Sequence, residues 1–161
     1  MASRLFDIFT DETIANTIKN RLPYLFQLAE IESSRAGKIG MQVGSVRENI
    51  VIALLAYIFG TDNIDTDIPI TEPEIDAILF GEPVSVKTIT GNLTGVKLIW
   101  TVDAQKAIEF SHNYSPSCDM LLAQIKWGAT GGFFYIPKIV QSVIFNNIGK
   151  ERYNSISMKD G

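Results

Sequence analysis

Apolar residues recur at helical spacing through the N-terminal third of the chain. The repeat is carried, at intervals of three or four residues, by Ile14, Ile18, Leu22, Leu25 and Leu28. Such intervals place side chains on one face of a helix. Thr10, followed by two acidic residues, predicts the start, because a hydroxyl caps the first turn and acids are favoured there. Pro23 interrupts the repeat, so we expect two helices, or one kinked helix, ending between residues 33 and 37.

A second helix is predicted over residues 45–59. Its start matches the capping-box pattern, with Ser45 followed three positions later by Glu48, and Gly60 is a typical stop signal. Every residue from 50 to 59 is apolar or aromatic. We therefore expect this helix to be buried on nearly every side. The glycine-rich segment 37–44 before it is predicted to be a connecting loop.

Two short runs rich in strand-forming residues flank Gly81-Glu82, within residues 74–87. A glycine-containing break of two residues between such runs predicts a hairpin. With the turn at Gly81-Glu82, Asp76 pairs with Lys87. Side chains alternate between the two faces of a strand. This register therefore predicts a polar face made of Glu74, Asp76, Ser85 and Lys87.

The rest of the pattern alternates between strands and helices. Strands are expected over residues 64–70, 96–102, 120–127 and 133–136. The glycine-rich segment between the last two is predicted to be a hairpin turn. A helix is expected from Asp103, with Ala104, Ala107 and Ile108 facing the sheet, and another over residues 138–147. This order predicts an α/β fold of mixed α+β character, in which helices flank a central mixed β-sheet.

The composition is that of one globular domain. The chain has 161 residues, of which 46% are hydrophobic and 20% charged, enough for a real core. A net charge of −4 and a pI of about 5.0 argue against a histone-like binder of phosphate backbones, although a local basic groove remains open. The single cysteine, Cys118, excludes an internal disulfide and a cysteine-based zinc site. With no signal-peptide pattern and no apolar run of about 18 residues, we expect a soluble, cytoplasmic protein.

The polar face of the predicted hairpin has two possible interpretations. A lysine opposite an aspartate is an ordinary cross-strand ion pair, worth up to about 1 kcal/mol. The same two groups on a rigid surface also suit the binding of a divalent ion and the handling of a water molecule. Glu48 has two readings as well. It completes the capping box with Ser45, or it presents a carboxylate from the end of a buried helix, and the two roles are compatible.

These motifs, in this order, resemble those of the PD-(D/E)xK nuclease superfamily, and among its members the type II restriction endonucleases. The resemblance covers about residues 40–136. Each motif is short, so the specificity lies in their order and in the elements that carry them. The motifs are a buried helix opening with Arg47-Glu48, Pro73-Glu74-Ile75-Asp76 at the end of one strand, Ser85-Val86-Lys87 in the next, and a helix after Trp100-Thr101-Val102-Asp103.

The resemblance implies a Mg²⁺-dependent type II restriction endonuclease that hydrolyses phosphodiester bonds at a specific site in double-stranded DNA. It also implies a homodimer, because twofold symmetry matches a palindromic site. Asp76 is then the metal-binding carboxylate and Lys87 the residue that orients or activates the attacking water. The backbone carbonyl of Val86 is a further metal ligand, and Glu48 is the helix carboxylate that several restriction enzymes add.

Ser85 departs from the family pattern, because it stands where the superfamily has Asp or Glu. We place it in the predicted catalytic set with Asp76, Lys87 and Glu48. A lost carboxylate weakens metal binding unless another acid replaces it, and Glu74 and Glu48 are the candidates. A catalytically damaged variant therefore remains open at this point.

We expect a single nuclease domain over residues 1–161. It comprises an N-terminal helical part (1–36), a catalytic core (40–136) and a disordered or truncated tail (150–161). Two alternative functions remain open on the sequence. One is a structure-selective DNA nuclease such as a junction resolvase. The other is an inactive DNA-binding or interaction module that keeps the nuclease fold.

Overall fold

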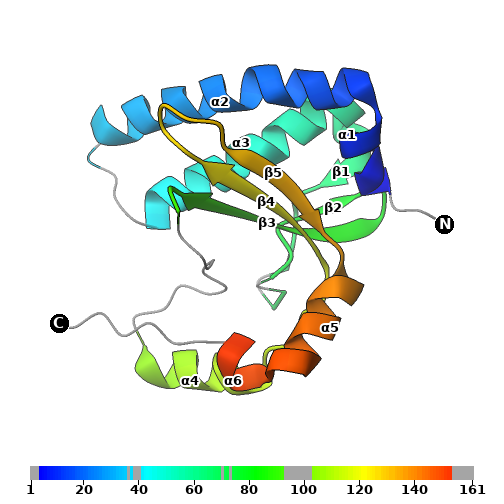
Figure 1. Ribbon diagram of the computed structural model, residues 1–161, viewed down its shortest axis with the longest axis vertical. Coiled ribbons are helices and arrows are strands. Elements are labelled where there is room, and N and C mark those ends of the chain that lie inside the picture. Colours follow the sequence, from blue (N-terminus) through cyan, green and yellow to red (C-terminus); the bar gives the residue numbers. More distant parts are fainter. Residues whose placement is uncertain are drawn as a thin grey trace.

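Among the residues that the structure describes, a five-stranded mixed sheet forms the centre of the protein (Figure 1). The computed structural model describes residues 4–35, 37, 41–69, 71–72, 74–92 and 103–153. The strands lie side by side in chain order, and only β3 and β4 are parallel while the other neighbouring pairs are antiparallel. They are β1 (Ile64–Asp65), β2 (Ala77–Leu79), β3 (Glu82–Thr90), β4 (Asp119–Ile125) and β5 (Gly132–Ile136). The predicted mixed sheet with flanking helices is confirmed.

Helices lie on both sides of this sheet. α2 and α3 run over one face, and α4, α5 and α6 gather on the opposite side of the molecule (Figure 1). Their bounds are η1 (Arg4–Phe6), α1 (Asp7–Thr10), α2 (Glu12–Arg35), α3 (Met41–Phe59), η2 (Thr61–Asn63), α4 (Ala104–Asn113), α5 (Lys138–Ile148) and α6 (Lys150–Tyr153). None of the helices in the described ranges is long and apolar enough to cross a membrane.

The core lies between α1 to α3 and the sheet face that they cover. Alternate residues of β2, β3 and β4 point into it, as the period of two requires. Its members are Leu5, Ile8, Ile18, Leu22, Phe26, Val51, Leu54, Leu55, Ala77, Leu79, Val84, Val86, Leu121, Ala123 and Ile125. The central sheet is therefore a rigid base for any side chain carried by β3.

The N-terminal helical prediction is confirmed in extent and corrected at its start. α2 runs through Pro23 as one helix and ends at residue 35. Its burial against the core outweighs the one backbone hydrogen bond that proline removes. The cap is Asp11, whose carboxylate accepts from the amides of Thr13 and Ile14 at 3.0 and 3.2 Å. The Thr10 hydroxyl instead donates to the carbonyl of Phe6 at 2.9 Å.

The helix predicted over 45–59 begins earlier than expected. α3 starts at Met41, so Ser45 lies inside the helix and the predicted capping box with Glu48 is wrong. Residues 41–44 are therefore helical rather than a loop. The stop at Gly60, with φ of 91°, is confirmed. α3 is also less enclosed than expected, because Ala53 is exposed and Tyr57 is 68% exposed. An apolar run alone does not tell which side of a surface helix faces water.

The hairpin of β2 and β3 forms with a register two positions away from the predicted one. Leu79 pairs with Glu82 and Ala77 with Val84, so the turn is Phe80-Gly81. Both turn residues have positive φ, 51° and 78°, as the tight hairpin turn of type I′ requires. A shift of two keeps every β3 side chain on its predicted face, because the strand period is two.

Other elements follow the prediction in part. β1 is shorter than the predicted strand over 64–70, and the strand predicted over 96–102 lies outside the described residues. α4 is capped by Asp103, which accepts from the amides of Gln105 and Lys106 at 2.9 and 3.3 Å. Ala104 and Ile108 are exposed, so their predicted contact with the sheet is wrong. The hairpin of β4 and β5 and the helix α5 are confirmed.

The predicted tail is partly regular. Lys150–Tyr153 forms α6, where we expected disorder from residue 150. The ring of Tyr153 stacks on that of Tyr114, with centroids 6.2 Å apart. The remainder of the tail lies outside the described residues.

Candidate active site

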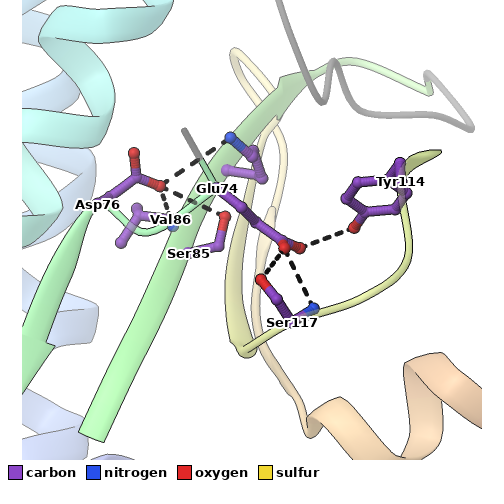
Figure 2. A network of polar contacts seen from close by, with 7 residues as sticks. Glu74, Asp76, Ser85, Val86, Tyr114 and Ser117 are labelled. Carbon is purple, nitrogen blue, oxygen red and sulfur yellow. Dashed lines mark hydrogen bonds and ion pairs between the residues drawn. The ribbon is translucent and has the colours of Figure 1, made fainter. Parts of the chain in front are cut away.

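Asp76 lies directly before β2, at the edge of the parallel pair of strands. One of its carboxylate oxygens, Oδ2, accepts a hydrogen bond from the Val86 amide at 2.7 Å and one from the Ser85 hydroxyl at 3.4 Å (Figure 2). Its own amide donates to the Val84 carbonyl at 3.0 Å. The side chain is 23% exposed. Asp76 is therefore held by β3 while part of its side chain remains exposed to solvent.

Lys87 lies on β3, two residues beyond Ser85. Its Nζ is 4.0 Å from Asp76 Oδ2, and the residue is only 7% exposed. The structure thus brings together the lysine and the carboxylate that the sequence analysis paired. At this separation, and with one partner largely buried, the two charges interact more strongly than a surface pair does.

Glu48 reaches the same region from α3. Burial raises its pKa from the ordinary value of 4.5 to about 7, the nearby Lys87 ammonium opposes this shift, and the Asp76 carboxylate adds to it. Charges act on a pKa in this way only at short range. Glu48 therefore belongs to the same electrostatic cluster as Asp76 and Lys87, as expected from the family resemblance.

The Asp76 carboxyl also has a raised pKa. Burial is the largest cause, while Lys87 and the hydrogen bonds from Val86 and Ser85 lower the pKa. The partly buried carboxylates of Asp76 and Glu48 thus share one ammonium, that of Lys87. One positive charge does not balance two negative charges. A divalent cation would supply the missing positive charge, and oxygen ligands of this type suit a hard cation such as Mg²⁺. The residues present therefore fit a metal site.

Ser85 is fully buried and contacts Asp76 through its hydroxyl. At the position where the superfamily has an acid, this chain has a group that donates to the neighbouring carboxylate. The hydrogen bond from the Ser85 hydroxyl lowers the pKa of the Asp76 carboxyl, because the bond favours the ionised form of Asp76. The geometry makes Ser85 a support for Asp76.

Glu74 points away from Asp76 (Figure 2). Its carboxylate accepts hydrogen bonds from the Tyr114 hydroxyl at 2.7 Å, from the Ser117 amide at 3.1 Å and from the Ser117 hydroxyl. Glu74 lies in a turn rather than in a strand, so the strand alternation that placed it beside Asp76 does not apply. Among the described residues, no three His, Cys, Asp or Glu side chains gather where they could hold a metal. A metal at Asp76 and Glu48 would therefore take its remaining ligands from the backbone and from water.

Tyr114 and Ser117 were not among the residues predicted from the sequence. They are 40 and 43 positions away from Glu74 along the chain. No spacing rule links residues so far apart, and neither of them belongs to a recognisable motif. The available signal was Glu74 itself, two residues before Asp76, because a glutamate that becomes buried there requires partners.

Comparisons with known proteins agree with this fold. The family model for the restriction endonuclease ThaI matches residues 8–161. A solved structure described as "Restriction endonuclease in complex with substrate DNA" is similar to this chain, with 53% sequence identity and a TM-score of 0.86. The match covers 98% of this chain and 77% of that one. A comparison with curated proteins finds no match. This chain therefore belongs to the ThaI restriction endonuclease family and is a site-specific type II nuclease.

Proposed function

We propose that the protein is a Mg²⁺-dependent enzyme that hydrolyses phosphodiester bonds at one specific sequence of double-stranded DNA. The observation that supports this most strongly is the cluster of Asp76, Lys87 and Glu48, built on a rigid strand and an adjoining helix. The similar solved structure is itself a complex with substrate DNA. Double-stranded DNA is therefore the substrate class we assign.

Asp76, Glu48 and the backbone carbonyl of Val86 are the proposed ligands of the metal. Mg²⁺ takes oxygen ligands, keeps several waters and needs only one or two protein carboxylates. When bound, it neutralises charge on the phosphate and acidifies a water. Glu48 and Asp76 provide two carboxylates without an acid at position 85.

Lys87 is the proposed partner of the attacking water. Its ammonium lies beside Asp76 and carries three donors, so it can orient the water oxygen towards phosphorus and stabilise the negative charge that develops there. As the new P–O bond forms, the bond to the leaving oxygen breaks. Ser85 and the Val86 amide keep the Asp76 carboxylate in place by donating to one of its oxygens.

We also propose a homodimer that acts in the cytoplasm. Two copies related by a twofold axis present two sites to the two strands of a palindrome. The outer side of α5 offers an apolar surface of the kind that an interface buries. Its exposed members are Ile139, Val140, Val143, Ile144 and Ile148. Sedimentation velocity should give a dimer mass, and a monomer mass with DNA bound would contradict this assignment.

The proposed function is tested by a digest of supercoiled plasmid DNA with and without Mg²⁺. Discrete fragments that appear only with Mg²⁺ are the expected result. Cleavage restricted to branched DNA would favour a junction resolvase. Plasmid that stays intact under all conditions would favour an inactive binding module.

Glu48→Gln tests the role of the helix carboxylate. Without metal, the folded protein retains a proton on Glu48 up to pH about 7, whereas the unfolded chain loses it near pH 4.5. Stability therefore falls as pH rises through this window, since the folded state binds more protons. We expect thermal melting of Glu48→Gln to depend less on pH over this range, with a melting temperature at pH 8 equal to or above that of the wild type.

The same variant should lower cleavage and raise the Mg²⁺ concentration needed by at least ~10-fold, because a ligand is lost. Wild-type cleavage should itself need more Mg²⁺ as pH falls below 7, since the cation competes with the proton on Glu48. A Mg²⁺ titration identical to that of the wild type would remove Glu48 from the ligand set.

A further inference from the structure

The chain that leads into Asp76 lies outside the regular elements of the fold. In the described part of the stretch 66–76, no residue belongs to a helix or strand. Two local turns, closed by backbone hydrogen bonds of 2.9 and 3.3 Å, shape it. The Asp76 amide then donates to the Val84 carbonyl. A segment built from turns needs a further anchor if it is to hold a catalytic carboxylate still.

Glu74 supplies such an anchor two residues before Asp76. It is 8% exposed, and each of its carboxylate oxygens accepts a hydrogen bond, Oε1 from Tyr114 and Oε2 from Ser117. Hydrogen bonds to an ionised acceptor are stronger than neutral ones. Breaking them would leave a buried charge without partners, which is costly. We call Glu74, Tyr114 and Ser117 the Glu74 clamp.

The other half of the clamp is tied to the sheet that carries Lys87. Ser117 lies two residues before β4, which runs parallel to β3 and pairs Asp119 with Val84. The intervening carbonyl of Cys118 accepts a hydrogen bond from the side-chain amide Nε2 of Gln141 on α5 at 3.0 Å. Tyr114 is also buried, and its amide closes the end of α4. The clamp therefore fastens the turn segment to the strand pair that carries the site.

We propose that Glu74 is a positioning residue. Its hydrogen bonds from Tyr114 and Ser117 fix the backbone, and the backbone fixes the position of Asp76 relative to Lys87. Figure 2 shows the two carboxylates directed away from each other, one towards the clamp and one towards Val86. The clamp acts through the backbone of residues 74–76. This inference deepens the proposed function and rests on it. It replaces the role of metal ligand that the sequence suggested for Glu74.

A positioning residue and a ligand respond differently to excess metal. Without the clamp, Asp76 samples several positions, so the apparent metal affinity falls. A high concentration of metal still selects the position in which Asp76 binds it. Loss of a ligand weakens metal binding too, but it also lowers the maximal rate, and excess metal does not restore that rate. The variants are Tyr114→Phe and Tyr114→Phe with Ser117→Ala, and Ser117→Thr retains the hydroxyl. Tyr135→Phe is the matched control, because it removes a 2.8 Å hydroxyl contact to Asp119 on the same β4 strand.

Two readouts are needed, Mn²⁺ binding by electron paramagnetic resonance and cleavage as a function of Mg²⁺. We expect Tyr114→Phe and the double variant to raise the Mn²⁺ dissociation constant and the Mg²⁺ half-saturation by about 10-fold. Their maximal cleavage rates should stay within about threefold of the wild type, since the ligands are intact. Ser117→Thr and Tyr135→Phe should match the wild type in both readouts. If the double variant does not fold, Tyr114→Phe alone decides, because it keeps the ring stacked on Tyr153.

The inference is overturned if the clamp variants bind Mn²⁺ and cleave as the wild type does. It is equally overturned if Glu74→Gln abolishes cleavage at every Mg²⁺ concentration while Tyr114→Phe has no effect, since Glu74 would then be a ligand. In both cases cleavage by the wild type leaves the proposed function standing. A wild type that neither binds Mn²⁺ nor cuts DNA would remove the proposed function and this inference together.

Discussion

Replacing Asp76 with asparagine should abolish DNA cleavage, by about 10³-fold or more, which corresponds to ~4 kcal/mol of lost transition-state stabilisation. Asparagine keeps the shape of the side chain and can still accept from the Val86 amide. It removes the negative charge that the metal requires. DNA affinity should be unchanged or increased, because repulsion between the site and the phosphates is also removed.

Single-turnover cleavage of a labelled duplex and an electrophoretic binding assay at fixed salt measure the two effects separately. Asp62→Asn is the matched control, because it makes the same change at an exposed position of η2. It should cut at the wild-type rate. Full cutting activity in Asp76→Asn would end the assignment of catalysis to this site.

Lys87→Ala is the second large effect, with an expected loss of about 100-fold or more in the cleavage step. Lys87 is 7% exposed and its ammonium lies beside the Asp76 carboxylate, so its removal takes away the positive charge nearest to the proposed water. Because the site keeps its carboxylates, Mg²⁺ should still bind. The lost rate should therefore not return at high Mg²⁺.

Lys87→Met separates charge from packing, since methionine fills most of the same volume without an ammonium. The two variants should lose activity to a similar degree, whereas Lys87→Ala should melt at a lower temperature because it leaves a cavity. Lys106→Ala on the exposed side of α4 is the control for a general loss of positive charge. An unchanged rate in both Lys87 variants would make Asp76 and Lys87 a structural ion pair.

The hairpin shows how a partly wrong prediction still brought Asp76 and Lys87 together. The turn was placed at Gly81-Glu82, whereas Phe80-Gly81 forms it. Glycine signals that a turn is near without saying which turn position it occupies. The error was an even number of residues, so Ser85 and Lys87 stayed on the face predicted for them. Strand periodicity thus predicted the correct face for these side chains, although the predicted strand pairing was wrong.

In helix α3, by contrast, a local motif gave the wrong helix start. The pattern around Ser45 and Glu48 fits a capping box, but the helix continues upstream to Met41. Helix ends depend on what the preceding residues pack against, which a local pattern does not contain. Because the helix starts at Met41, the Glu48 side chain does not cap it. Its carboxyl group then interacts electrostatically with Lys87 and Asp76, and both of these groups shift its pKa.

By itself, the sequence determined the fold class, most of the elements and the identity of the cluster residues Asp76 and Lys87, because helical and strand periods and the order of short motifs are local properties. The tertiary structure alone decided the strand register, the side of α3 that faces water and the direction of the Glu74 carboxylate. Each of these depends on residues far apart in the chain, such as Glu74 and Tyr114, 40 positions apart. Such contacts form only when the packed core and the buried hydrogen bonds are satisfied together, and no spacing along the chain encodes that condition.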